Sequence, residues 1–324
     1  MIPLGEFVPA REHLEEGLTL YNPAQHRSNA FLYGGYDPGV SCLGWRTWAL
    51  WFLGYPDQAL KSIQKALSLA QELSHPESLA NALFFAVGFH QLRHEQQLTQ
   101  ERAEALITLS HEQGLPVVLA WGIILQGWVL AEQRQEEEGI AQMRQGLDAW
   151  QATGAEAVRP YLLTLLAEAF GKVGQTEEGL SVLAEALAQV DKTGERMYEA
   201  ELYRIKGTLT LQKEFQVQGS KFQVENPQSA FHNPQLEAEA CFLKAIDIAQ
   251  KQQAKSLELR AATSLVRLRQ QQAAQSESRT TDHASRTRLD EAHQMLSEIY
   301  NWFTEGFDTK DLQEAKMLLD ELSH

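Results

Sequence analysis

The sequence of 324 residues predicts an all-α fold: a right-handed α-solenoid of about six to seven helical hairpins with a C-terminal capping helix. Three features predict it. Small residues recur with a steady period, apolar residues recur at steps of three and four as amphipathic helices require, and glycine-rich turns separate the amphipathic segments. Helix pairs of this kind bury their apolar faces by stacking on neighbouring pairs, so the array should form one elongated domain.

The period is about 40 residues. Antiparallel helices approach closely only where one side chain is nearly absent, so each repeat should place a small residue at the helix crossing. The small positions in the first helix of successive units are separated by 39, 41, 40 and 40 residues; they are Thr47, Ala86, Gly127, Ala167 and Gly207.

A second pattern of small residues marks the second helix of each unit. One strong copy pairs Ala59 with Ala66, and another, which follows the turn glycine Gly174, pairs Gly179 with Ala186. The glycine supplies the left-handed backbone that ends a helix. Weaker copies pair Ala10 with Gly17, Leu98 with Ala105, Gly139 with Gly146, Ala238 with Ala245, and Ala292 with Ile299.

Turn residues and polar stretches divide the array into parts. We expect one domain over residues 1–324. Its parts are an unpaired N-terminal helix (1–20), a linker (21–39), regular repeats (40–213), a polar insertion (214–235), the last repeats (236–308) with a mobile loop at 272–287, and a cap (309–324).

Composition excludes several classes of protein. Lys and Arg number 28 against 43 Asp and Glu, so the net charge is −15 and no nucleic-acid partner is expected. The longest strongly apolar run, residues 45–55, is too short to cross a bilayer, and the N-terminus does not read as a secretion signal. We therefore expect a cytoplasmic protein with no membrane partner. Cys42 and Cys241 are too far apart in sequence to predict a disulfide scaffold or a zinc module.

No set of residues predicts catalysis. His94-Glu95 and His111-Glu112 begin like metalloprotease helices, but no second histidine follows four residues later, and we interpret both histidines as solvated helix ends. The acidic run 136–138 is expected to open a helix and complement its dipole. We therefore expect no enzyme activity, no metal and no cofactor.

One unit carries the signature of a known repeat. Ala167, Phe170, Gly174, Gly179 and Ala186 occupy the five signature positions, and the pattern resembles the tetratricopeptide repeat, whose usual period is 34 residues. The longer helices of this chain are similar to the sensor regions of signalling ATPases of the STAND class. This resemblance covers nearly the whole chain and implies that the first helix of each pair lines a concave face.

Four segments resemble the C-terminal repeats of bacterial adenylate/guanylate cyclase–ATPase fusion proteins; they are residues 26–39, 53–59, 194–196 and 300–308. In such proteins this region is taken to be a regulatory interaction module. A phosphate-binding Gly-x4-Gly-Lys-Ser/Thr loop is absent, and the array opens on a helix of the second type. We therefore expect a fragment or a detached relative of these proteins, with an N-terminal helix that awaits a partner.

The resemblance also implies a binding surface on the concave face. Projecting the concave register onto this chain gives ten expected partner-binding residues: Trp45, Trp48, Phe52, Phe84, Trp121, Leu125, Trp128, Tyr161, Glu168 and Arg204. The rings would form an apolar strip wider than a core needs, which is typical of an interaction surface. Peptide-binding relatives clamp a carboxylate with Lys and Asn, but these places hold Ser41, Gly44, Trp48 and Ala80 here, so an apolar or helical ligand is expected.

Three hypotheses follow. The leading one is a non-enzymatic protein–protein interaction module, the regulatory end of a signalling ATPase or cyclase system, that binds an apolar or helical partner segment in the concave groove. The alternative is a small-molecule sensor whose pocket lies at Trp121, Trp128 and Tyr161. The third is self-association through the helix at residues 1–20.

Overall fold

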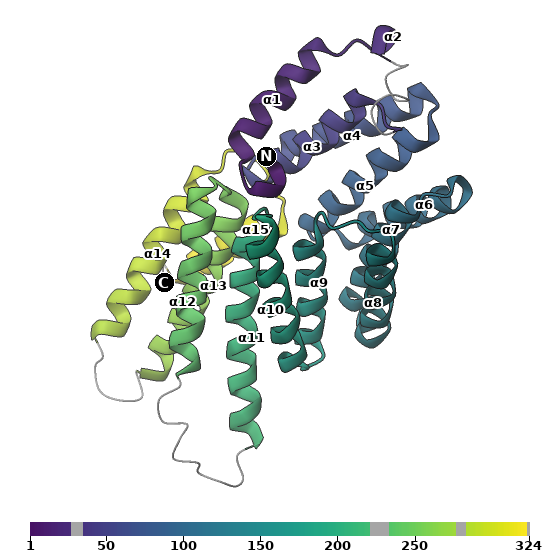
Figure 1. Ribbon diagram of the computed structural model, residues 1–324. Helices are drawn as coiled ribbons and strands as arrows, with labels where there is room; N and C mark the ends of the chain where they lie inside the picture. The colour runs from purple at the N-terminus through teal and green to yellow at the C-terminus, as the bar shows by residue number, and fades with distance from the viewer. Residues whose placement is uncertain (27–34, 221–232, 277–282, 323–324) are drawn as a thin grey trace.

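The computed structural model describes residues 1–26, 35–220, 233–276 and 283–322, and every regular element in these ranges is a helix (Figure 1). The elements are η1 (Ile2–Leu4), α1 (Phe7–Leu20), α2 (Pro23–His26), α3 (Pro38–Phe52), α4 (Pro56–Leu73), α5 (Pro76–Leu92), α6 (Gln96–Gln113), α7 (Pro116–Glu132), α8 (Glu136–Ala152), α9 (Arg159–Lys172), α10 (Thr176–Thr193), α11 (Glu199–Ser220), α12 (Pro234–Lys251), α13 (Lys255–Ser276), α14 (His283–Trp302) and α15 (Lys310–Leu322).

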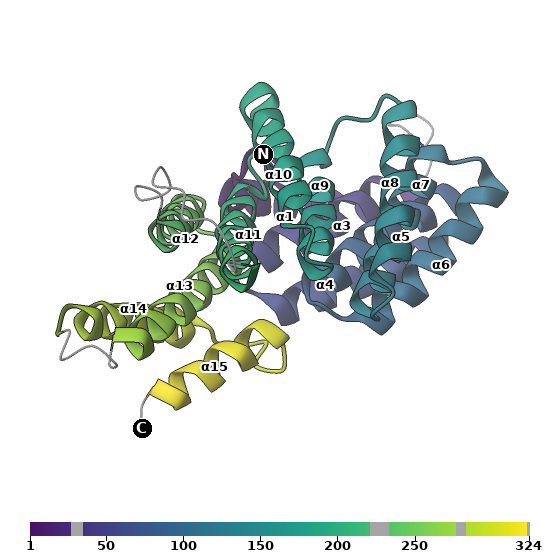
Figure 2. The ribbon, with the colours of Figure 1, turned by 90° about the horizontal axis from the view of Figure 1, so that it is seen from below.

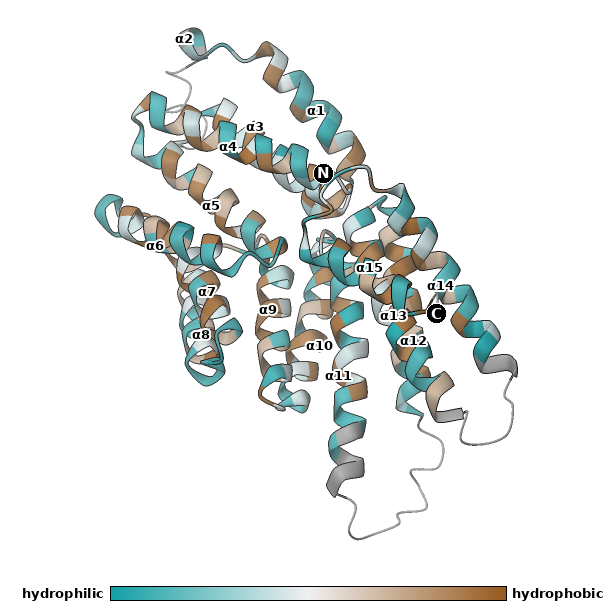
Figure 3. Cartoon of the chain, turned by 180° about the vertical axis from the view of Figure 1, so that it is seen from behind, coloured by the Kyte–Doolittle hydropathy of each residue, from teal (hydrophilic) through white to brown (hydrophobic). Residues whose placement is uncertain are grey.

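The helix ends follow from local chemistry. Several helices begin with proline, which has no N–H group to leave unsatisfied in the first turn. The carboxylate of Asp37 caps α3 by accepting a hydrogen bond from the amide of Val40 at 3.0 Å. Helices α6 and α10 end at Gly114 and Gly194, whose positive φ values of 65° and 74° suit glycine. Apolar and polar residues alternate along α4, α10 and α15, as amphipathic helices require (Figure 3), whereas α5 and α7 are apolar over most of their length.

The predicted all-α solenoid is confirmed: α3 to α14 form successive helical hairpins, and α15 follows as a cap. The small residues lie at the helix crossings as expected. A Cβ atom on Gly127 would lie 2.8 Å from the carbonyl oxygen of Gly139, and one on Gly139 would lie 2.5 Å from that of Gly127, so α7 and α8 touch backbone to backbone.

One predicted pair of small residues was wrong by one position. In α6 the residues that face the core are Thr99 and Leu106, which are fully buried, whereas Ala105 is exposed to solvent. They stand at the same distance from the helix start as Ala59 and Ala66 do in α4. Leu106 occupies the position that Ala66 has in α4, and the neighbouring Ala105 was mistaken for the small residue of the pair.

The first helices of the hairpins form an inner layer. Helices α3, α5, α7, α9, α11 and α13 each contact the next one in this series, and each second helix packs against the first helices on either side of it (Figure 2). This arrangement follows from the register of small residues, because a first helix must approach both its own partner and the next first helix.

The inner layer closes on itself, since α13 also contacts α3. The hydroxyl of Ser256 donates a hydrogen bond to the carbonyl oxygen of Trp51 at 2.5 Å. The guanidinium of Arg260 donates to the carbonyl oxygen of Leu92, also at 2.5 Å. These bonds join the two ends of the array, so the inward faces of the first helices point at one another across a ring.

The loop after α14 completes this closure. One carboxylate oxygen of Glu305 accepts hydrogen bonds from the first-turn amides of Asp57 and Gln58 at 3.1 and 3.0 Å. The amide of Gly306 donates to the carboxylate of Asp57, and a Cβ atom on Gly306 would lie 2.1 Å from Pro56, so only glycine fits. We call the contact of residues 55–58 with residues 302–306 the closure junction. Two of the segments identified from the sequence, 53–59 and 300–308, therefore meet in space.

Replacing Glu305 with glutamine should weaken the closure junction. A carboxylate at a helix N-terminus interacts favourably with the helix dipole and accepts charge-assisted hydrogen bonds, so we expect Glu305→Gln to lower the free energy of unfolding by about 1 kcal/mol. Urea denaturation measures this change. Glu298→Gln is the control, because that carboxylate is exposed and accepts a hydrogen bond from Gln294 of its own helix. Equal effects of the two substitutions would contradict the junction.

Residues 194–196, another of the four segments identified from the sequence, contact the N-terminal residues of the chain. The amides of Arg196 and Met197 donate to the carbonyl oxygen of Pro3 at 2.7 and 3.0 Å. Farther along, the ring of Phe7 stacks on that of Phe52 with 4.5 Å between centroids. Helix α1 thus lies against α3, and the N-terminal end of the chain is anchored to the turn before α11.

Glu195 in this segment gives a pH prediction. It is 8% exposed, and burial raises the pKa of its carboxyl to about 7 despite a backbone hydrogen bond at Val158. The folded chain therefore holds this proton more tightly than the unfolded chain, and its free energy of unfolding falls as the pH rises from 4.5 to 7. We expect the free energy of unfolding of Glu195→Gln, relative to that of wild type, to be about 2 kcal/mol higher at pH 8 than at pH 4.5. Urea denaturation of both proteins at the two pH values measures this change. A difference that does not change with pH would contradict this account.

Several helices extend beyond the boundaries expected from the sequence. Helix α11 continues to Ser220 and α12 begins at Pro234, so both helices extend into the expected insertion 214–235. Helices α13 and α14 likewise reach into the expected loop 272–287, up to Ser276 and from His283. Residues 221–232 and 277–282 of these two segments, and residues 27–34 of the expected linker, lie outside the described residues.

Candidate functional site

The inward aromatic side chains of the first helices meet at the centre of the ring. Trp121 of α7 lies 5.9 Å from Trp48 of α3, 4.3 Å from Phe84 of α5 and 5.6 Å from Tyr161 of α9, measured between ring centroids. Tyr161 lies 5.0 Å from Tyr198. We call this cluster the aromatic hub; it comprises Trp48, Phe52, Phe84, Phe85, Trp121, Tyr161 and Tyr198.

Three polar side-chain groups of the hub have hydrogen-bond partners. The indole N–H groups of Trp48 and Trp121 donate to the carbonyl oxygens of Phe85 and Phe84 at 3.2 and 3.0 Å. The hydroxyl of Tyr161 donates to the side chain of Gln91 at 2.6 Å. Since a buried indole or phenol needs a partner, these bonds fix the rings in place and identify the hub as core.

The expectation of an open aromatic strip was wrong for most of its residues. Six of the ten predicted residues are at most 2% exposed: Trp48, Phe52, Trp121, Leu125, Trp128 and Tyr161. Because the ring closes, positions that would face solvent in an open solenoid face other inner helices. Trp45 and Phe84 retain partial exposure, and Glu168 and Arg204 lie at a cavity beside the hub.

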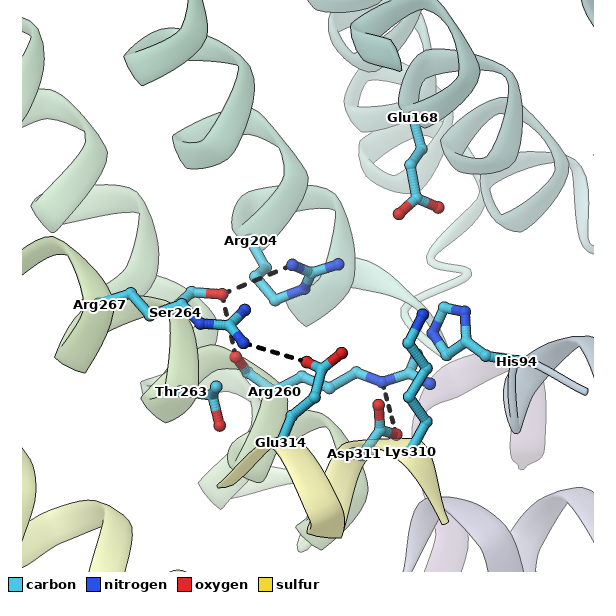
Figure 4. Close-up of a pocket in the computed structure, with 10 residues that line it drawn as sticks. All are labelled: His94, Glu168, Arg204, Arg260, Thr263, Ser264, Arg267, Lys310, Asp311 and Glu314. Carbon is cyan, nitrogen blue, oxygen red and sulfur yellow. Dashed lines mark hydrogen bonds and ion pairs between the residues drawn. The ribbon is translucent and has the colours of Figure 1, made fainter. Parts of the chain in front are cut away.

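That cavity is the candidate site, and it is polar. It encloses about 150 Å³ between the inner helices α9, α11 and α13, the turn after α5, and the first turns of α15 (Figure 4). We call it the concave cavity; its lining comprises His94, Glu168, Arg204, Arg260, Thr263, Ser264, Arg267, Lys310, Asp311 and Glu314.

Most charged groups of the lining are held in ion pairs. The guanidinium of Arg204 binds both carboxylate oxygens of Glu201, at 2.9 and 2.7 Å. Arg260 binds Asp311 at 2.9 Å, lies 3.6 Å from Glu201 and stacks over the ring of Trp51. These pairs join α11, α13 and α15, and the bidentate geometry keeps the guanidinium groups oriented.

Three groups of the lining have no such partner. Glu168 of α9 and Lys310 of α15 make no hydrogen bond or ion pair within the described part of the chain, and the ring of His94 bonds none of these residues. Figure 4 shows the carboxylate of Glu168 and the ammonium of Lys310 directed into the space at the centre of the lining, with His94 beside Lys310. The cavity thus offers one free anion, one free cation and one imidazole.

Burial and neighbouring charge set the protonation of these groups. Burial raises the pKa of Glu168, while the nearby Arg204 and Lys172 oppose this shift. Burial lowers the pKa of His94 well below its usual value, and the cationic groups of Arg260 and Lys310 lower it further. His94 is therefore a neutral imidazole at neutral pH, able to donate or accept a hydrogen bond.

Sequence reasoning found part of this site. Glu168 and Arg204 were predicted because they continue the inward register of the first helices. His94 was interpreted as a solvated helix end, which was wrong, since it is partly buried at the cavity. Arg260, Ser264 and Arg267 stand on one face of α13 at helical spacing, and that pattern could have revealed them.

Other candidate chemistry finds no support in the structure. Cys42 is half-buried and Cys241 is buried, and burial raises the pKa of both thiols, which disfavours the reactive thiolate. In the ranges that the structure describes, His, Cys, Asp and Glu form no group of three or more that could hold a metal ion. None of the helices within those ranges has the length and apolar character needed to span a bilayer.

Comparisons with known proteins support the fold. The apo form of RapI is 12% identical to this chain with a TM-score of 0.56, over 91% of this chain and 96% of RapI. A STAND protein with a tetratricopeptide repeat sensor, PH0952 of Pyrococcus horikoshii, is 14% identical with a TM-score of 0.47, over 97% of this chain and 45% of that protein. The likeness to RapI supports an all-helical solenoid of repeated hairpins.

A comparison of sequences finds one curated relative, and a comparison with family models finds no match. The uncharacterized protein R02095 of Rhizobium meliloti (strain 1021) is 23% identical over 206 residues, which are 64% of this chain and 20% of that protein. The chain therefore spans about a fifth of the length of this relative. No family model matches the sequence.

Proposed function

We propose that this chain is a non-catalytic regulatory module that recognises a charged ligand in the concave cavity. The observation that carries this proposal is the pair of unpartnered charges, Glu168 and Lys310, in a lining whose other charged side chains are paired. Glu168 is partly buried, where an ionised group without a partner is unfavourable, so a ligand that supplies the missing partner binds with a net gain. Lys310 is exposed and adds an attractive positive charge at the rim of the cavity.

The size of the cavity limits the ligand. Pockets for drug-sized molecules enclose roughly 300–1,000 Å³, whereas this cavity encloses about 150 Å³. It is too small for a helical segment but can hold a small molecule or one charged side chain of a partner. The sensor hypothesis is therefore favoured, with its pocket at the polar lining and not at Trp121, Trp128 and Tyr161.

The regulatory setting is proposed from the sequence. The four segments that resemble the repeats of cyclase–ATPase fusion proteins suggest a signalling ATPase or cyclase system as the context. Two of them form the closure junction, next to α15. A ligand that bridges α9 and α15 would stabilise the closed ring, and the closed state is what a signalling partner would detect.

A thermal-shift screen tests this function. The chain is mixed with a varied panel of amino acids, nucleotides, sugar phosphates, carboxylic acids and short peptides. We expect at least one compound to raise the melting temperature, and we expect Glu168→Gln and Lys310→Met each to reduce that rise. Glu178→Gln and Lys316→Met are matched controls on exposed positions of α10 and α15. A flat panel, or a rise that both cavity variants retain, would contradict the proposal.

A second candidate function is docking of an apolar or helical partner segment at the edge of the aromatic hub. The observation that favours it is the partial exposure of Trp45 on α3 and Phe84 on α5, which both contact Phe85. Trp45→Ala should then abolish partner binding, whereas substitutions in the concave cavity should leave it unchanged.

A further inference from the structure

The free groups of the concave cavity differ in charge, and their combination selects a class of ligand. Glu168 offers a carboxylate from α9, and Lys310 offers an ammonium from the first turn of α15. The remaining cations are occupied: Arg204 by Glu201, Arg260 by Asp311, and Arg267 by Glu314 at 3.3 Å. A ligand therefore meets one unpaired negative group and one unpaired positive group.

We propose that the concave cavity binds a small zwitterion of amino-acid size, with the cationic end at Glu168 and the anionic end at Lys310. This inference rests on the proposed function and names the ligand class of the same site. The imidazole of His94 stands beside Lys310 (Figure 4), in position to donate a hydrogen bond to the anionic end of a bound ligand. Because its pKa is lowered, it does so without adding a charge of its own.

Ligands with a single charge fit less well. A purely anionic ligand would satisfy Lys310 but would place a second negative charge near the carboxylate of Glu168. A purely cationic ligand would satisfy Glu168 but would meet Lys310 and the guanidinium groups of Arg204 and Arg260. Only a ligand with both charges pairs both free groups and leaves none of them unpaired.

The volume of the cavity also points to a free molecule. An internal residue of a protein segment carries no backbone charge, and a whole segment does not fit into about 150 Å³. A free amino acid or a molecule of similar size carries both charges within a short span. The two charged ends can then reach across the cavity from α9 to α15.

Calorimetric titration with chemically matched ligands tests the inference on the full chain. Free amino acids are titrated first, and the tightest is compared with its N-acetyl form, which lacks the cation, and its methyl ester, which lacks the anion. We expect each blocked form to bind roughly ten- to a hundredfold more weakly, because each loses one charged hydrogen-bonded contact. Glu178→Gln and Lys316→Met should bind the parent amino acid as wild type does.

The variants assign each end of the ligand to its residue. In Glu168→Gln the parent amino acid and its N-acetyl form should bind equally, since the contact that distinguishes them is gone. In Lys310→Met the parent and its methyl ester should bind equally for the same reason. Circular dichroism and the melting temperature of each variant establish that it is folded before titration.

Three results would overturn the inference. If a blocked form binds as tightly as its parent, the ligand is not recognised as a zwitterion, although the cavity can still be the regulatory site. If no amino acid binds but another compound of the panel depends on Glu168 and Lys310, only the ligand class is wrong. If no compound binds at all, the inference and the proposed function both fail.

Discussion

Replacing Arg260 with methionine is expected to lower the free energy of unfolding by about 3–5 kcal/mol. This guanidinium is 6% exposed and bonds Asp311, lies beside Glu201 and donates to the carbonyl oxygen of Leu92. Removing one partner of a buried ion pair leaves uncompensated charge, which is far more unfavourable than the loss of an exposed pair. Methionine retains most of the apolar stem but lacks the guanidinium that lies over the ring of Trp51, so the change reports on charge, hydrogen bonding and this cation–π contact.

Urea denaturation followed by circular dichroism measures this effect. The matched control is Arg267→Met, about two turns farther along the same face of α13, whose side chain is 51% exposed and pairs with Glu314. We expect the control to change stability by less than about 1 kcal/mol, as for other exposed ion pairs. If the two arginine variants were equally stable, α13 would not bridge α3, α5 and α15 in the way described.

The second large effect is expected at the crossing of α7 and α8. A Cβ atom at position 139 would lie 2.5 Å from the carbonyl oxygen of Gly127 and 2.6 Å from the backbone nitrogen of Ala131. These are backbone atoms, so the hairpin must open to accept a methyl group. Gly139→Ala is therefore expected to lower the free energy of unfolding by about 3 kcal/mol.

Gly17→Ala is the control for this substitution. In α1 the added methyl group would meet only the sulfur of Cys42 at an ordinary 3.6 Å. Since alanine is the better helix former, this variant should gain up to about 1 kcal/mol. Thermal denaturation measures the stability of both variants relative to wild type. A neutral or stabilising Gly139→Ala would contradict the close crossing of α7 and α8.

The repeats could be predicted from the sequence because their determinants are local. The spacing of Ala86, Gly127 and Ala167 is set by the crossing of helices that are neighbours in the chain, and Gly174 lies in the turn of its own hairpin. Each of these features acts within about 40 residues, and a single period repeated over the chain reveals it.

Closure of the ring could not be predicted, because it depends on contacts between distant segments. The hydrogen bond from Ser256 to Trp51 joins residues that are 205 positions apart, and no local sequence pattern predicts it. Trp48 and Trp121 were therefore assigned to an open surface, although closure places them in the core. Lys310 is likewise a first-turn residue of the capping helix, and it lines the cavity together with residues that are distant in the sequence, such as His94 and Glu168.

The central claim is that the polar concave cavity, and not the aromatic surface, receives the ligand. The most direct test is the ligand-induced rise in melting temperature of Trp45→Ala and Lys310→Met, each compared with the same variant without ligand. We predict that Trp45→Ala retains the rise seen in wild type and that Lys310→Met loses it. Loss in Trp45→Ala together with a full rise in Lys310→Met would show that the site lies at the aromatic edge instead.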